Sequence, residues 1–251
     1  MPFASVNDIQ MYYEEEGQGT PLILMHGASS SIDDPVFSWL DLVPEFARSY
    51  RAIQVEHRGH GRTDNPAGRL DYHLIASDIC AFIEQLGAGP AHLAGVSDGG
   101  IAALTVGMTR PDLARSLIAV GPNYYNDEQV LEANQFADLS AMPQRAQEKM
   151  AARHDRGGKE PGAWRALFEQ LAANLAINPA YTLEDLARIP NPTLLISGED
   201  DLWGNIGQMT DMKRAIPHAE LLIVNHAPHE VQHTHSWLVG PQVLDFLARH
   251  P

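Results

Sequence analysis

The 251-residue sequence predicts an α/β fold in which helices cover both faces of a mostly parallel sheet. Short apolar runs of strand length alternate with stretches that carry apolar residues at helical spacing, as parallel strands with helical crossovers do. One such run, residues 91–96, leads into a Gly-x-Ser-x-Gly turn and then into a helical stretch. Two later apolar runs end in an acidic loop and in a loop that carries histidines. Functional groups gather at the carboxyl ends of parallel strands, so these loops are expected to meet there.

The expected strands follow from the hydrophobic period and from the turn residues between them. Residues 3–16 alternate in polarity around a plausible turn at Asn7-Asp8, which predicts one or two antiparallel edge strands. Continuous apolar runs predict strands that are buried on both faces. These runs lie at residues 21–25, 51–55, 91–96, 116–120, 193–197 and 220–224.

Helical spacing of apolar residues predicts the helices between these strands. Residues 72–86 have this spacing, and Gly87 is expected to end the helix. A helical stretch also begins directly after the Gly-x-Ser-x-Gly turn, at residues 101–104. The last helix is expected to run from about Gln242 to His250, because Pro241 is well placed to start it.

Residues 124–188 interrupt the alternation of strands and helices. They show no strand pattern, are rich in Ala, Gln, Glu and Arg, and are too long for one crossover. We therefore expect an inserted helical cap at 124–188 on a core made of residues 1–123 and 189–251. The alternative is a set of ordinary helices that cover the sheet.

Composition excludes several classes of protein. Lys and Arg number 17 against 32 Asp and Glu, and the net charge of −15 disfavours nucleic acid and anionic membranes as partners. The single cysteine, Cys80, lies in a helix-like apolar stretch and predicts a buried structural thiol rather than a disulfide. The beginning of the sequence has no basic leader, and no apolar run is long enough to span a membrane. A cytoplasmic protein is expected.

The segment Gly95-Val96-Ser97-Asp98-Gly99 carries the chemistry. A strand that reverses into a helix within a few residues forces the serine into a strained backbone conformation and lifts its hydroxyl above the sheet. Glycines flank it because side chains there would collide with the neighbouring strand and helix. The pentapeptide alone is weak evidence, but the strand before it and the helix after it favour a nucleophilic Ser97.

A nucleophilic serine needs a histidine to take its proton and an acid to orient that histidine. The acidic loop after residues 193–197 offers Asp200 and Asp201, and the loop after residues 220–224 offers His226 and His229. The order serine, acid, histidine is the one found after a Gly-x-Ser-x-Gly elbow.

With these residues in place, the chain resembles the α/β-hydrolase superfamily from its first His-Gly to its last helix. It looks most like the small, cofactor-free esterases and lactonases with a helical cap, on an eight-stranded type of sheet. This resemblance selects Asp201 as the triad acid and His229 as the triad base, although the loop 226–229 lacks the family's usual glycines. The resemblance implies no cofactor and no metal.

Two backbone amides are expected to bind the oxyanion of the tetrahedral intermediate. One belongs to Asp98, and the other, by resemblance, to Ala28 after His26-Gly27; His26 is expected to shape this loop. The Asp98 side chain has two open interpretations. It either forms a buried hydrogen bond away from the reacting atoms, or it binds an ammonium group of the substrate.

The motif His229-Glu230-Val231-Gln232-His233 could also indicate a zinc protease. It directly follows a strand and a proline, and no glutamate lies downstream to act as the third ligand. Both features disfavour a zinc protease. A non-catalytic ligand receptor of the same fold is the other alternative from a different class.

The sequence thus predicts a serine hydrolase that cleaves a carboxylic ester or lactone of a small molecule, as a monomer or homodimer. Thioesterase, carbon–carbon bond hydrolase and acyltransferase chemistry remain open on the same fold, whereas a serine nucleophile disfavours haloalkane dehalogenases and epoxide hydrolases. Aromatic residues of the cap and the acidic loop either line an acyl pocket or pack the cap on the core. They are Tyr124, Tyr125, Phe136, Trp164, Phe168 and Trp203.

Overall fold

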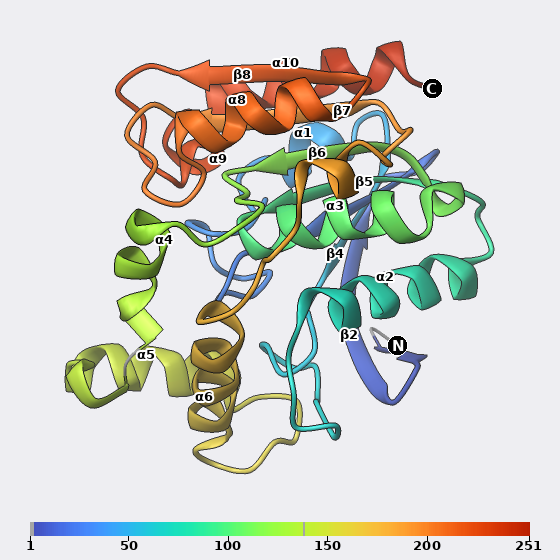
Figure 1. Cartoon of the computed structure of the whole chain (residues 1–251). Coiled ribbons are helices and arrows are strands. Elements are labelled where there is room, and N and C mark those ends of the chain that lie inside the picture. The colour runs from blue at the N-terminus through green and yellow to red at the C-terminus, as the bar shows by residue number, and fades with distance from the viewer. Residues whose placement is uncertain (1–2, 138) are drawn as a thin grey trace.

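The computed structural model describes residues 3–137 and 139–251, with only the backbone described at 136 and 137. Within this part of the chain, eight strands form one sheet in the order β1-β2-β4-β3-β5-β6-β7-β8, and helices lie on both of its sides (Figure 1). The fold predicted from the sequence is confirmed. The strands are β1 (Phe3–Val6), β2 (Ile9–Glu16), β3 (Pro21–Met25), β4 (Arg51–Val55), β5 (Ala91–Val96), β6 (Ala114–Val120), β7 (Thr193–Gly198) and β8 (Ala219–Val224).

Strands β1 and β2 form the antiparallel edge that the alternation predicts. Val6 pairs with Ile9 across a two-residue turn, and β2 also runs antiparallel to β4. Asn7 has a φ of 48° in this turn, a left-handed conformation that asparagine tolerates better than most residues. From β4 to β8 all neighbouring strands are parallel.

Alternate residues of the parallel strands pack into two separate cores, one on each face. Ile23 and Leu93 face the core under α2 and α3, whereas Leu24 and Ala94 face the core under α1 and α10. This division follows from the two-residue period of a strand, and it explains why the strand sequences are apolar throughout. The helices of the core are α1 (Val43–Phe46), α2 (Tyr72–Leu86), α3 (Asp98–Thr109), α8 (Ile206–Ala215), α9 (Val231–Thr234) and α10 (Ser236–Arg249).

Two predictions about these helices have clear outcomes. Cys80 on α2 is buried, and burial raises the pKa of its thiol to about 11, as expected of an unreactive packing residue. The last helix begins at Ser236 rather than at Gln242, so the predicted start at Pro241 is wrong. Pro241 lies inside α10, where the burial of Val239 together with Val243 on the sheet outweighs the lost backbone hydrogen bond.

Between β6 and β7 the described residues form helices and 3-10 turns, with one isolated bridge from Tyr125 to Ala180. Helices α5 and α6 extend away from the sheet, below it in the view of Figure 1. The division of the chain into a core and a cap stays a prediction. No helix within residues 3–137 and 139–251 is long and apolar enough to cross a bilayer. The helices of this segment are α4 (Glu128–Ala133), α5 (Gln144–His154), α6 (Ala163–Leu175) and α7 (Leu183–Leu186).

The chain reverses from β5 into α3 at the carboxyl end of the sheet, where neighbouring backbone segments lie very close together. A Cβ on Gly95 would lie 2.0 Å from the carbonyl carbon of Gly99, and a Cβ on Gly99 would lie 2.7 Å from the carbonyl oxygens of Met25 and His26. Real Cβ atoms do not approach backbone so closely. Glycine is therefore required at both positions, and α3 lies directly against the loop that follows β3.

Replacing Gly99 by alanine is expected to destabilise the protein by about 1–3 kcal/mol or more, because the added methyl group meets backbone that cannot move aside. Urea unfolding of Gly99→Ala against wild type measures the loss. Gly207→Ala on α8 is the matched control, since its Cβ would meet only the Asn205 side chain at 3.3 Å. The control should be neutral or stabilising by up to about 1 kcal/mol. Equal stabilities of the two variants would contradict the packing argument.

Candidate active site

Ser97 immediately precedes the first turn of α3, and its backbone has the strained conformation that the sequence predicts. Its φ of 53° and ψ of −118° lie outside the regions that non-glycine residues prefer. The Ser97 N–H donates to the carbonyl of Val120 at 2.7 Å, which joins the turn to the end of β6. The residue therefore stands at the carboxyl end of the sheet and at the N-terminus of a helix, where a negative charge is stabilised.

His229 and Asp201 form a buried pair at the ends of β8 and β7. His229 Nδ1 lies 2.8 Å from each carboxylate oxygen of Asp201, and the two residues are only 5% and 3% exposed. Nδ1 therefore carries the proton and donates it to the carboxylate, which leaves Nε2 free to accept a proton. Asp200, its neighbour in the acidic loop, is exposed. The structure thus pairs the histidine with the acid that the family resemblance selects.

The Asp201 carboxylate is held by several donors besides His229. It accepts hydrogen bonds from the backbone N–H groups of Trp203 at 2.8 Å and Gly204 at 2.9 Å, and Ser197 Oγ lies 3.0 Å away. Burial alone would raise the pKa of Asp201, but His229 and these donors together lower it below its usual range. Asp201 stays ionised at neutral pH and can stabilise an imidazolium.

Sequence reasoning missed two residues that support this pair, Ser197 and Gly121. Gly121 has a φ of +60°, and a Cβ there would lie 2.7 Å from His229 Cε1 and 2.9 Å from an Asp201 oxygen. A side chain at Gly121 would displace the imidazole. The only sequence signal was the position of each residue at the end of a predicted strand.

His226 is a loop residue without a role in this pair. Its side chain is 91% exposed, and its backbone N–H donates to Glu199 at 2.9 Å. The exposure of its side chain makes His226 a solvated loop histidine. The two histidines of the zinc-like motif also have different partners, because His233 Nδ1 lies 2.6 Å from Asp41. Within the described residues, no group of three or more His, Cys, Asp or Glu side chains could hold a metal ion.

A cavity of about 250 Å³ brings the predicted residues to one place. Ser97, Asp98, His229 and Ala28 all line it, so residues that follow three different strands share one space. The segment between β6 and β7 supplies part of the wall. The remaining lining residues are Ser29, Phe37, Asn123, Asn126, Asn134, Leu175 and Trp203.

The aromatic residues named from the sequence divide between lining and packing. Trp203 lines the cavity, and its ring centroid lies 4.6 Å from that of His229. Trp164 and Phe168 are buried on α6, and their rings pack on each other with centroids 5.7 Å apart. Tyr124 is buried and Tyr125 is partly exposed, and neither lines the cavity. The side chain of Phe136 lies outside the described part of the chain.

The loop after β3 places Ala28 beside the serine. A Cβ on Gly27 would lie 3.3 Å from Ser97 Cβ, so the two backbones are in near contact. His26 is buried, donates from Nδ1 to the Gly27 carbonyl at 2.8 Å and accepts the His57 N–H at Nε2. Burial lowers the pKa of His26 to about 4, so its ring is neutral and shapes the loop as expected.

The Asp98 side chain forms the buried hydrogen bond of the first interpretation and also borders the cavity. Tyr72 Oη donates to Asp98 Oδ1 at 2.9 Å, and Asp98 is only 4% exposed. Burial raises the pKa of the Asp98 carboxyl to about 6. The folded protein therefore binds a proton at Asp98 more tightly than the unfolded chain does, for which the pKa is about 4.

Asp98→Asn is expected to be more stable than wild type above pH 6, because wild type must then hold a buried carboxylate. The loss of stability that the ionised Asp98 causes in wild type is absent below about pH 4, grows as the pH rises through 6, and reaches about 2–3 kcal/mol. Urea unfolding of both proteins between pH 4.5 and pH 8 measures the difference, in which the other titrating groups largely cancel. A difference that does not change with pH would contradict the raised pKa.

Comparisons with known proteins find relatives and solved structures that are similar over most of the chain. The chain is 25% identical to the putative carbamate hydrolase RutD of Azorhizobium caulinodans, over 91% of each chain. It is 24% identical to the 2-(acetamidomethylene)succinate hydrolase of Mesorhizobium japonicum, over 96% of this chain and 93% of the relative. The crystal structure of the enol-lactonase from Burkholderia xenovorans matches the fold with a TM-score of 0.76 at 20% identity, over 98% and 100% of the two chains.

A model of the alpha/beta hydrolase family matches residues 22–239. This range contains the strand after which Ala28 lies, the reversal at Ser97, and both members of the Asp201–His229 pair. It also contains the helices between β6 and β7. The chain belongs to the α/β-hydrolase family.

Proposed function

We propose that the protein is a serine hydrolase that cleaves a carboxylic ester or a lactone of a small molecule. One observation carries the proposal. Ser97 and His229 line the same small cavity together with Ala28 and Asp98, and the buried Asp201 is paired with His229. A nucleophile, an oriented base and two oxyanion donors are the groups that acyl transfer to water requires.

In the proposed reaction, the Ser97 hydroxyl attacks the acyl carbon while its proton passes to His229 Nε2. Asp201 stabilises the imidazolium that forms, as its low pKa allows. The oxyanion of the tetrahedral intermediate accepts hydrogen bonds from the N–H groups of Ala28 and Asp98. Collapse of this intermediate expels the alcohol, which takes the proton from His229. Water then attacks the acyl-serine in the same way and releases the acid.

The size and lining of the cavity favour a small substrate. A volume of about 250 Å³ is at the lower end of ligand sites, and asparagines and aromatic residues line much of it. We propose that the segment 124–188 acts as a cap that closes this space through Asn126, Asn134 and Leu175. The buried Cys80 and the acidic composition fit a cytoplasmic enzyme acting on a small-molecule acyl substrate, as a monomer or homodimer.

The relatives widen the range of substrates that the test must include. Two of them are named as hydrolases of a carbamate and of 2-(acetamidomethylene)succinate, so bonds from acyl carbon to nitrogen belong beside esters and lactones. A thioester covers the thioesterase alternative. Because Asp98 borders the cavity, the panel also includes an α-amino ester.

Wild type is expected to hydrolyse at least one ester or lactone of this panel, and Ser97→Ala is expected to lose kcat by about 10⁴-fold or more, since the triad acts as a unit. Asp201→Asn should lose kcat by about 10³–10⁴-fold, because it no longer holds the reactive tautomer of His229. Initial rates with chromogenic substrates measure both effects.

Asp200→Asn is the matched control in the same loop and should retain the wild-type rate, because Asp200 is exposed and its carboxylate is not the partner of His229. A Ser97→Ala variant that turns over as fast as wild type would refute the proposed nucleophile. A loss of rate in Asp200→Asn but not in Asp201→Asn would identify Asp200 as the acid that orients His229.

A further inference from the structure

The inserted segment reaches past the cavity and binds the loop that follows β3. Arg153 and His154, at the end of α5, both contact the carbonyl oxygen of Ser29. Arg153 Nη1 donates to it at 3.0 Å, and His154 Nε2 lies 3.0 Å from it. Ser29 immediately follows Ala28, whose amide is one of the proposed oxyanion donors.

His154 has a defined tautomer because both of its ring nitrogens have partners. Its Nδ1 accepts the N–H of Gly61 at 3.0 Å, so the proton must sit on Nε2 and is donated to Ser29. The side chain is fully buried, and burial lowers its pKa to about 3. His154 is a neutral donor of fixed orientation rather than a proton carrier.

A row of imidazoles provides a second connection from α5 to the same loop. The His154 ring packs on that of His60 with centroids 5.7 Å apart, and the His60 ring packs on that of His26 with centroids 5.0 Å apart. His26 in turn donates to the carbonyl of Gly27. All three rings have lowered pKa values because of burial, so the row is uncharged and packs like apolar rings.

Ser29 needs such support because its φ of 52° is left-handed. Non-glycine residues rarely adopt this conformation, which persists only where the surroundings fix it. If the Ser29 carbonyl lost its donors, the backbone could relax, and the amide of Ala28 would turn with it. An oxyanion donor acts only when it is placed in advance at the position of the oxyanion.

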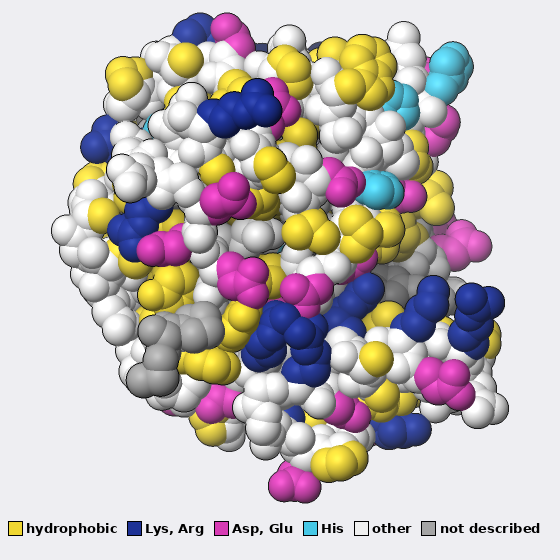
Figure 2. All heavy atoms as spheres, turned by 180° about the vertical axis from the view of Figure 1, so that it is seen from behind, with side chains coloured by type: hydrophobic (Ala, Val, Ile, Leu, Met, Phe, Trp, Pro, Cys, Tyr) yellow, Lys and Arg dark blue, Asp and Glu magenta, His cyan; other side chains and the backbone are white. Residues whose placement is uncertain are grey.

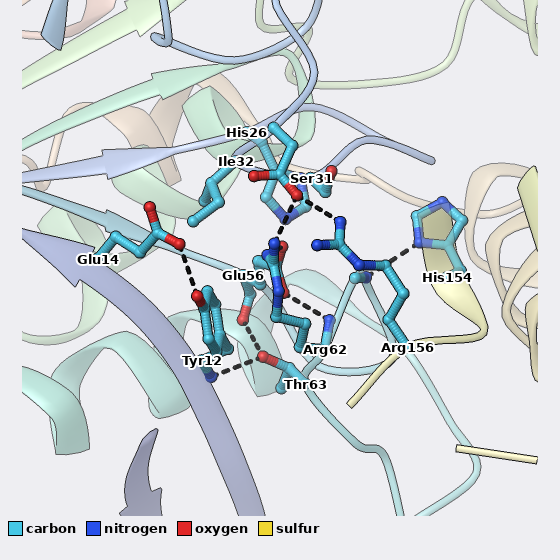
Figure 3. Close-up of polar contacts among 12 residues, drawn as sticks. Tyr12, Glu14, His26, Ser31, Ile32, Glu56, Arg62, Thr63, His154 and Arg156 are labelled. Carbon is cyan, nitrogen blue, oxygen red and sulfur yellow. Dashed lines mark hydrogen bonds and ion pairs between the residues drawn. The ribbon is translucent and has the colours of Figure 1, made fainter. Parts of the chain in front are cut away.

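Basic residues further along the segment attach it to the core without contacting Ser29. Arg156 and Arg62 both bind Asp33, and Lys159 donates to the carbonyl of Gly59 at 2.9 Å. Figure 3 shows Arg62 and Arg156 converging, with His154 on the side of Arg156. Basic side chains also gather at the lower right of Figure 2, the side on which the inserted helices lie after the half-turn from Figure 1. The contacts of Arg156 and Lys159 therefore attach the segment to the core without supporting Ser29.

We propose that His154, together with Arg153, is a positioning residue of the oxyanion hole, which makes the inserted segment part of the catalytic apparatus as well as a wall of the cavity. The inference rests on the proposed function, since it assigns a task to the Ala28 amide. His154 itself does not touch the substrate. It acts through the Ser29 carbonyl on the stabilisation of the tetrahedral intermediate.

The test compares His154→Gln with His154→Asn. The amide nitrogen of glutamine reaches the position of Nε2 and keeps a donor to Ser29, whereas asparagine reaches only the position of Nδ1. His154→Asn is expected to lose up to about a hundredfold in kcat, the effect of a misplaced oxyanion donor, with KM little changed. His154→Gln should retain most of the activity. Urea unfolding of both variants shows that each is folded.

A trifluoromethyl ketone reports on the oxyanion directly, because Ser97 adds to its carbonyl and leaves an oxyanion in the hole. Its inhibition constant should rise in His154→Asn in parallel with the fall in kcat/KM, and much less in His154→Gln. Arg156→Met should keep kcat within about twofold, because it removes only a partly exposed ion pair.

Equal kcat and equal inhibition constants in the two His154 variants would overturn the inference, and so would an equal loss in Arg156→Met. Ser97→Ala separates this failure from failure of the proposed function. If Ser97→Ala is inactive and the His154 variants do not differ, the enzyme is a serine hydrolase whose oxyanion hole does not depend on α5. If Ser97→Ala is active, the proposed function itself is wrong.

Discussion

The backbone reversal at Ser97 is the constraint on which the rest of the site depends. Three segments meet there at distances that exclude a single Cβ: Gly95 lies against Gly99, and Gly99 lies against the last residues of β3. This contact fixes the start of α3 relative to the loop that carries Ala28. It also explains the positive φ of Ser97, since the chain can turn within this space only through a conformation that most residues avoid. One packing requirement therefore brings together the N-terminus of α3, the Ser97 hydroxyl and the loop after β3.

Around this reversal, the surroundings of the two carboxyl groups shift their pKa values away from the usual range. Asp201 is surrounded by donors and stays ionised, whereas Asp98 is buried beside Tyr72 and binds its proton more tightly than usual. The two carboxyls lie in the same site with pKa values shifted in opposite directions. Because an Asp98 carboxylate, which forms as the pH rises through 6, would oppose a developing oxyanion, the protonation of this side chain and the function of its backbone amide are physically connected.

Most of the fold could be predicted from the sequence because its signals are local. The apolar runs of β3 to β8 and the turn at Asn7 identify the sheet, and the strand ends identify Ser97 and the loops that carry the acid and the histidine. The choices of Asp201 over Asp200 and of His229 over His226 needed the family resemblance, since both members of each pair follow the same strand. The start of α10 was misplaced because a local preference for proline at a helix start gave way to burial of Val239.

What could not be predicted depends on contacts between distant segments. Gly121 and Ser197 support the Asp201–His229 pair only because β6, β7 and β8 lie side by side. The link from His154 to Ser29 joins residues 125 positions apart, and nothing in either local sequence indicates it. The sequence predicts an insertion at 124–188, but the contacts of this segment with the loop after β3 emerge only from the three-dimensional arrangement.

A nucleophilic Ser97 carries a covalent acyl group during turnover, and mass spectrometry of the enzyme quenched during hydrolysis of an acyl ester detects it. The mass of the protein should increase by that of the acyl group, and the adduct should map to the peptide containing Ser97. His229→Ala should show no adduct under the same conditions. Steady turnover with the acyl group on another residue, or with none on Ser97 when hydrolysis of the intermediate is slowed, would contradict it.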